Sequence, residues 1–173
     1  IAITTVIFPT LSRLAAQGDA LGMRRAYEQG IRLILAITVP AAVGLVVLRE
    51  AIIGLLFEWG AFSGADTQVA APLLFAYALA LPFYALATYA VRGFHALQDT
   101  RTPVWAALVA FAVNLVGSLI LMQSLGALGL ALANVFSAAV QALLLTHWLK
   151  LKKPELGGIR LAGCVGKIAG AAL

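Results

Sequence analysis

The sequence is poor in the residues on which most enzymes and metal sites depend. Its single cysteine, Cys164, excludes both a disulfide and a Cys-x-x-Cys metal site within the chain. The two histidines, His95 and His147, lie 52 residues apart, and neither has a partner at the spacing of a metal ligand. A His-Glu-x-x-His motif, a phosphate-binding glycine loop and a pair of intramembrane aspartates are also missing. We therefore expect a protein that is not an enzyme, with no catalytic residue, no metal centre and no bound cofactor.

Charged residues are scarce as well. They make up 11% of the chain, whereas they form about a quarter of a soluble globular domain. The mean hydropathy is +0.99, and 62% of the residues are hydrophobic. These values exclude an ordinary soluble domain and place the chain in a lipid bilayer.

The hydrophobic residues come in stretches of membrane-spanning length. Residues 69–91 carry no charge, and a helix of about 20 apolar residues crosses the hydrocarbon core. Residues 104–149 are also uncharged, which is about twice a single crossing, so we place a hairpin at the polar, glycine-containing stretch 123–129. The predicted fold class is an all-α polytopic membrane helix bundle that forms a single membrane domain over residues 1–173. About four full spans are expected, at residues 33–57, 67–91, 103–122 and 127–149, with truncated spans at residues 1–12 and 159–173, as in a fragment cut inside two helices.

The basic residues fall on alternate connections between these spans. Ten of the twelve Lys and Arg residues lie in connections that share one side of the membrane if every span crosses once. The positive-inside rule makes that side cytoplasmic. Topology thus explains the net charge of +5, and we expect no nucleic-acid partner because the basic residues lack interleaved aromatic residues.

One connection reads QDTRTPV and lies between two very apolar stretches. Thr102 is expected to cap the next helix through its hydroxyl, with Pro103 at the first helical position. Asp99 and Arg101 then lie in a short cytoplasmic turn, close enough in sequence to pair with each other. Capping and topology alone account for these residues. The alternative is a role in contacting a substrate or a gate, for which the candidates are Arg92, Asp99 and Arg101.

Three segments carry a resemblance to a known family. They read FPTLSRLAAQGD near the start, LLFEWGAFSGADT in the middle and RGFHALQDTRTPV further on. In order and interval they are similar to the MurJ/MviN family of lipid II flippases, within the multidrug/oligosaccharidyl-lipid/polysaccharide exporter superfamily. The resemblance extends from Ile1 to about Lys153. It implies a two-lobed, multi-pass transporter of the bacterial inner (cytoplasmic) membrane, with this chain as part of the second lobe.

The resemblance also implies an activity and its partners. A flippase of this kind moves the lipid-linked peptidoglycan precursor by alternating access. Its expected partners are this precursor, the membrane lipids and the missing remainder of its own chain. In such a family the cytoplasmic helix ends border the cavity entrance, where Arg101 would attract a pyrophosphate headgroup. Two alternatives stay open. One is another lipid-linked oligosaccharide, polysaccharide or drug exporter of the same superfamily, and the other is a structural membrane subunit that transports nothing.

Polar residues recur inside the last two full spans. Asn114 and Ser118 are four residues apart and share one face of a helix. The next span carries Asn134, Ser137 and Gln141 at a similar spacing. Because the two spans run antiparallel, we expect the polar faces to meet near mid-membrane. They serve either as interhelical hydrogen bonds or, in a family thought to use ion gradients or membrane potential, as a site where Asn114, Ser118 and Asn134 hold a coupling cation, Na⁺ or H⁺.

Overall fold

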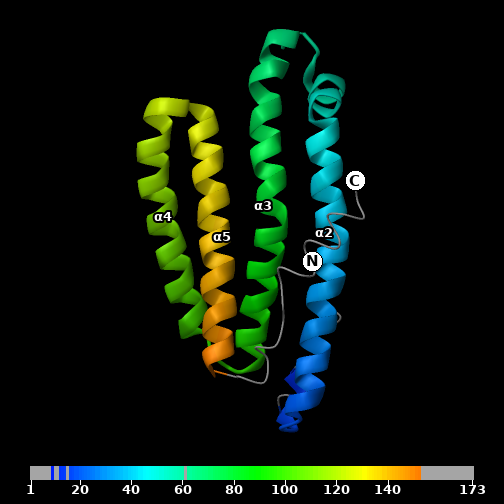
Figure 1. The fold of residues 1–173 in the computed structure, drawn as a ribbon, viewed down its shortest axis with the longest axis vertical. Coiled ribbons are helices and arrows are strands. Elements are labelled where there is room, and N and C mark those ends of the chain that lie inside the picture. Colours follow the sequence, from blue (N-terminus) through cyan, green and yellow to red (C-terminus); the bar gives the residue numbers. More distant parts are fainter. Residues whose placement is uncertain (1–8, 10–11, 15, 61, 153–173) are drawn as a thin grey trace.

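Long helices make up almost all of the chain that the structure describes. The computed structural model describes residue 9 and residues 12–14, 16–60 and 62–152 (Figure 1). Its helices are α2 (Ala20–Phe57), α3 (Gly64–Ala96), α4 (Arg101–Leu125) and α5 (Ala127–Lys152). Each of them is long and apolar enough to cross a membrane. The predicted all-α membrane helix bundle is therefore confirmed. The truncated span at residues 159–173 and nearly all of the one at residues 1–12 lie outside the described residues.

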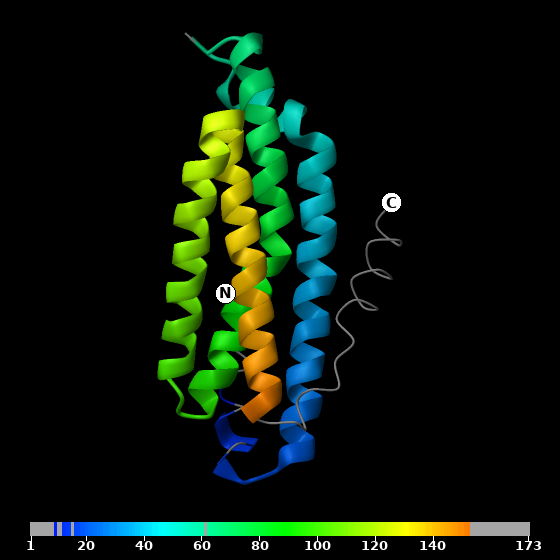
Figure 2. The ribbon, with the colours of Figure 1, turned by 60° about the vertical axis from the view of Figure 1, so that its left-hand side comes forward.

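The four helices stand side by side in the order α4, α5, α3, α2, and each runs antiparallel to its neighbour in the chain (Figure 1). Helix α3 contacts both α2 and α5, whereas α4 packs mainly on α5. Figure 2 shows the same arrangement from a second direction, with α4 and α2 at opposite sides. The start of α2, the α3–α4 connection and the end of α5 therefore share one end of the bundle.

Helix α2 is longer than the membrane span predicted for it. It begins at Ala20, whereas the predicted span begins at residue 33. The side chain of Asp19 accepts a hydrogen bond from a first-turn N–H group at 2.9 Å, and Arg24 Nε pairs with Glu28 Oε1 at 2.9 Å one turn along. The basic connection predicted before this span is therefore largely helical. The face next to the ion pair contributes three buried side chains, Met23, Tyr27 and Ile31.

Aromatic rings and glycines join α2 to α3. Tyr27 and Tyr89 stack with ring centroids 4.9 Å apart and an angle of 24° between the rings. A Cβ added to Gly30 would lie 2.0 Å from the Tyr89 hydroxyl oxygen. A Cβ added to Gly93 would lie 3.1 Å from Cε2 of Tyr27. Each ring thus occupies space that a glycine on the other helix leaves open, and both tyrosines are buried.

Small residues join α4 to α5. The two helices are connected by Gly126 alone, whose φ of +56° is a conformation that glycine adopts without strain. A Cβ added to Gly129 would lie 2.2 Å from the Leu121 carbonyl oxygen, so the two backbones nearly touch. A Cβ added to Gly117 would lie 3.2 Å from that of Ala133. The turn lies within the stretch predicted for the hairpin.

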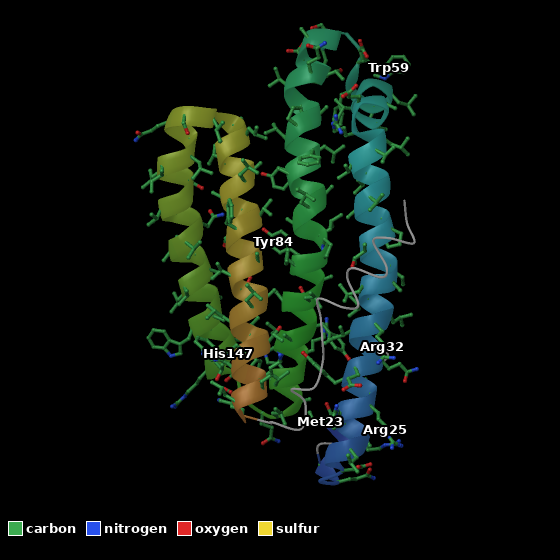
Figure 3. The ribbon with its side chains drawn as sticks, in the orientation of Figure 1. Met23, Arg25, Arg32, Trp59, Tyr84 and His147 are labelled. Carbon is green, nitrogen blue, oxygen red and sulfur yellow. The ribbon has the colours of Figure 1, made fainter. Side chains whose placement is uncertain are left out.

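Basic residues gather at the end of the bundle that holds the α3–α4 connection. Arg25 and Arg32 lie near this end of α2, and Trp59 lies at the opposite end (Figure 3). The other basic residues here are Arg13, Arg24, Arg92, Arg101, Lys150 and Lys152. Within the described ranges Arg49, toward the far end of α2, is the exception. The arrangement agrees with the predicted alternation, and the positive-inside rule assigns this end, which we call the basic end, to the cytoplasm.

Candidate functional site

Asp99, in the connection between α3 and α4, organises the start of α4. Its Oδ1 accepts hydrogen bonds from the backbone N–H groups of Arg101 and Thr102, both at 3.1 Å. Its Oδ2 accepts one from the Thr102 hydroxyl at 2.6 Å. The prediction that Thr102 caps this helix, with Pro103 at its first position, is therefore wrong. The helix begins at Arg101 because the carboxylate reaches the first-turn N–H groups directly, and Pro103 still replaces an N–H that would have no partner within the helix.

Lys152, at the end of α5, fastens this connection to a distant part of the chain. Its ammonium group forms an ion pair with the Asp99 carboxylate and donates a hydrogen bond to the Thr102 hydroxyl at 2.8 Å. Arg101, although close enough in sequence to pair with Asp99, does not do so in the described part of the chain, where Lys152 is the partner. Hydrogen bonds from Lys152 and Thr102 hold the pKa of Asp99 well below its usual range, so this carboxylate is charged at neutral pH. We call Asp99, Thr102 and Lys152 the Asp99 cluster.

The two arginine candidates lie on either side of the same connection. Arg101 is exposed on the first turn of α4, and its guanidinium makes no hydrogen bond to any described residue. Arg92 is half-buried near the end of α3, and its buried Nε has no hydrogen-bond partner among residues 16–60 and 62–152. A guanidinium group carries five N–H donors in a planar fork that matches a carboxylate or a phosphate. Donors for an anion are therefore free at the basic end.

Two of the intramembrane polar residues hydrogen-bond to other helices. The side-chain oxygen of Asn134 accepts a hydrogen bond from the hydroxyl of Tyr84, which lies on the side of α3 that faces α5 (Figure 3). The Ser137 hydroxyl donates to the Ala110 carbonyl oxygen of α4 at 2.7 Å. Tyr84 was not expected to take part, because it lies 50 residues from Asn134 in the sequence. The polar residues thus tie α5 to both of its neighbours.

Asn114 and Ser118 lie half-buried on α4. No hydrogen bond joins either of them to Asn134 within the described ranges, so the structure shows no direct hydrogen bond between these two polar faces. The side-chain oxygens of the three residues are neutral, and such hard donors suit a cation such as Na⁺ better than a softer transition metal. No group of three or more His, Cys, Asp or Glu residues able to hold a metal ion occurs among the described residues.

Comparison with known proteins gives one consistent family. A family model described as "Lipid II flippase MurJ" matches residues 1–167. A probable lipid II flippase MurJ of Rhizobium meliloti is 39% identical over 145 residues, which cover 84% of this chain and 27% of the relative. A second, from Thermotoga maritima, is 37% identical over 150 residues, which cover 87% of this chain and 31% of the relative. A solved structure described as "Lipid II flippase MurJ, inward closed conformation" aligns with a TM-score of 0.84 and 27% identity, covering 99% of this chain and 34% of its own. The chain thus spans about a third or less of the length of the proteins that it matches.

Proposed function

The chain belongs to the lipid II flippase MurJ family, and from that premise we propose that the full-length protein moves lipid II, the lipid-linked peptidoglycan precursor, across the bacterial inner membrane. The observation that carries this proposal is the family match along almost the whole chain. Four membrane-length helices with a basic cytoplasmic end support it. The protein acts as a transporter by alternating access and not as an enzyme, and the remainder of the full-length protein completes the cavity.

In this proposal the basic end receives the headgroup of the lipid. The pyrophosphate of lipid II is an anion, and an arginine binds such a group through paired, charge-assisted hydrogen bonds. Arg101 suits the task because its guanidinium is exposed and makes no hydrogen bond to a described residue. Arg92 is the second donor. Asp99 acts indirectly, since it fixes the backbone of the helix turn that carries Arg101.

Complementation of a bacterium depleted of its own lipid II flippase tests the proposal. We expect expression of the full-length protein to restore growth, with transport of a labelled lipid II confirmed in membrane vesicles. Protein that is present in the membrane at a normal amount but fails to restore growth would contradict lipid II as the substrate. Transport of another lipid-linked saccharide or a drug would then be the activity to measure.

Three variants test the role given to Arg101. At equal amounts in the membrane, Arg101→Gln should lower lipid II transport more than Asp99→Asn does, because it removes the anion-binding group itself. Arg101→Lys should lie between Arg101→Gln and the unmodified protein, because it keeps the charge and loses the fork. Full transport by Arg101→Gln would show that Arg101 serves only topology, which Arg92 maintains.

A coupling cation is the second part of this proposal. Of the two candidates, Na⁺ and H⁺, the neutral oxygens of Asn114, Ser118 and Asn134 suit Na⁺, because amide and hydroxyl groups do not bind a proton near neutral pH. The supporting observation is that the oxygens of Asn114 and Ser118 have no hydrogen-bond partner among the described residues. The Asn134 oxygen, although bonded to Tyr84, keeps a second lone pair. All three residues lie on the neighbouring helices α4 and α5.

The dependence of transport on a sodium or proton gradient tests this part. Asn114→Leu should weaken that dependence in proteoliposomes, whereas Ser137→Ala, which removes a hydroxyl from the same helix pair but not from the proposed set, should keep it. Unchanged coupling in Asn114→Leu would exclude the site. Unchanged activity per folded molecule, with lower thermal stability, would assign these residues to helix packing alone.

A further inference from the structure

A groove between α4 and α5 lies at the basic end and has no part in the proposed transport. Its volume is about 550 Å³, and it opens at the surface of the helix pair. Figure 3 labels His147, the neighbour of Trp148 in the sequence, in the lower part of this pair. It is lined mainly by apolar side chains, among them two tryptophans. The lining residues are Thr102, Trp105 and Val109 of α4, and Trp148, Leu151 and Lys152 of α5.

The groove changes from polar to apolar along its length. Its mouth holds the Thr102 hydroxyl and the Lys152 ammonium group, which hydrogen-bond to each other. Val109 lies two turns further along α4, about 10 Å from Thr102 at 1.5 Å per residue. Trp105 lies between these levels and is 63% exposed. Tryptophan collects at the membrane–water interface, so the groove runs from the headgroup level into the acyl region.

The mouth of the groove also offers a donor to an anion. An ammonium group has three N–H donors, and the Lys152 ammonium uses two of them on Asp99 and Thr102. The Asp99 carboxylate balances the charge of Lys152. Arg101 does not line the groove, but it and the other basic residues make this end of the bundle positive as a whole. The mouth therefore presents a free N–H donor, at a positively charged end of the bundle, above an apolar floor.

We propose that this groove binds an anionic phospholipid of the cytoplasmic leaflet, with its phosphate at Lys152 and an acyl chain along Trp105, Trp148 and Val109. A phospholipid combines the two properties that the groove requires, because one molecule carries a phosphate joined to long apolar chains. The surrounding leaflet supplies it, and basic pockets on this side of the membrane favour anionic headgroups. A free phosphate ion would leave the apolar floor empty. The bound lipid stays in the leaflet and is distinct from the transported substrate.

Native mass spectrometry of the full-length protein in detergent tests the proposal without any transport step. The probes are phosphatidylglycerol and phosphatidylcholine with identical acyl chains, added at equal concentration. We expect the protein to retain phosphatidylglycerol in preference. Lys152→Gln should lower its occupancy about fivefold, the effect of one basic residue near an anionic membrane surface, and Trp105→Ala should lower it by a similar factor.

Two control variants make the result specific. Phe111→Ala removes another exposed aromatic side chain of α4, and Lys150→Gln removes another charge from the last turn of α5, but neither residue lines the groove. Both should retain phosphatidylglycerol like the unmodified protein. Because Lys152→Gln also disturbs the Asp99 cluster, Trp105→Ala supplies the independent result. Equal retention of the two lipids, as expected if another part of the full-length protein covers the groove, would overturn the proposal, and so would an equal loss in Phe111→Ala.

Discussion

The α2–α3 pair and the α4–α5 pair are both antiparallel membrane hairpins, yet they are held together in different ways. Large side chains fill the first pair, where the rings of Tyr27 and Tyr89 occupy space beside glycines of the opposite helix. Alanine and glycine form the second pair, where the backbones nearly touch at Gly129. Lipid provides little hydrophobic drive between helices, so association depends on close packing and hydrogen bonds. The two hairpins show that either interlocking rings or close backbones can supply that packing.

The difference also determines which substitutions should destabilise each hairpin most. In α2–α3 the tight contacts are made by the ends of side chains, which can move by small amounts. In α4–α5 they involve the backbone, which cannot move without shifting the helix. Buried side chains of the first pair include Tyr27, Leu35, Tyr89 and Phe94. Those of the second include Ala106, Ala110, Ala131, Ala133 and Ala138.

Gly129→Ala should therefore produce the largest loss of stability. The added Cβ would lie 2.2 Å from the Leu121 carbonyl oxygen, so α4 and α5 have to separate. We expect the free energy of unfolding to fall by about 3 kcal/mol, at the upper end for overpacking. Chemical unfolding of the full-length protein in mixed micelles measures the change. Gly44→Ala is the matched control, because nothing lies within 4 Å of its added Cβ, and it should not destabilise. Equal effects of the two variants would contradict the backbone contact.

Gly30→Ala should have a smaller effect. Its added Cβ meets the Tyr89 hydroxyl, which is the end of a side chain and not backbone. We expect the free energy of unfolding to fall by about 2 kcal/mol, within the range for an overpacked core. Tyr89→Phe removes the hydroxyl oxygen but leaves ring atoms of residue 89 close to the added Cβ. The double variant should therefore recover part of the loss and be more stable than the sum of the two single changes predicts. Strict additivity in this double-mutant cycle would show that the two residues do not clash.

Asp99→Ala tests the connection that joins the two hairpins. It removes both a helix cap and a partly exposed ion pair, and the free energy of unfolding at pH 7 should fall by about 1 kcal/mol. Asp99→Asn should lose less, because an amide oxygen still accepts hydrogen bonds from the first-turn N–H groups. The pKa of Asp99 is lowered in the folded protein, so its stabilisation is present above the unfolded pKa and is lost as the pH falls through the folded one.

Thermal melting at a series of pH values checks that sign. The difference in melting temperature between the unmodified protein and Asp99→Ala should be constant near neutral pH and should narrow as the pH falls below about 4. Lys152→Gln removes the partner charge, so its melting temperature should depend less on pH than that of the unmodified protein. A difference that widens in acid would mean that Asp99 is not held as a carboxylate in the folded protein.

Tyr84→Phe should have the smallest effect of the four. It removes the hydrogen bond from α3 to Asn134 of α5, and such a bond between membrane helices contributes about 0.6 kcal/mol on average. Double-mutant analysis with Asn134→Leu isolates that contribution. A loss as large as that of Gly129→Ala would mean that polar contacts, and not close packing, hold the two hairpins together.

Much of the fold was predictable because hydropathy and charge act locally along the chain. The all-α membrane bundle and the alternation of basic ends follow from stretches of consecutive residues. The early start of α2 was missed because its first three turns are rich in charge. Only the regular spacing of Met23, Tyr27 and Ile31 indicated a continuing helix.

The site was less predictable because its contacts join residues that are distant in the sequence. Lys152 lies 53 residues from Asp99, and local sequence offers no reason to select it over Lys150. The choice depends on the rotation of α5 beside the α3–α4 connection. The capping role of Asp99 was, by contrast, within reach. An aspartate placed just before a helix start is a common cap, and it competes with the threonine that we had favoured.

The unbroken length of α2 has a mechanical consequence. Its 38 residues span about 57 Å, nearly twice the hydrocarbon core of about 30 Å, so the cytoplasmic turns and the membrane segment form one continuous helix with Pro40 near its midpoint. A tilt of about 10° around the midpoint of α2 would displace each end of the helix by about 5 Å, given the rise of 1.5 Å per residue. A small rotation of α2 inside the bilayer would therefore produce a larger displacement at its cytoplasmic end, which carries Arg24 and Arg25.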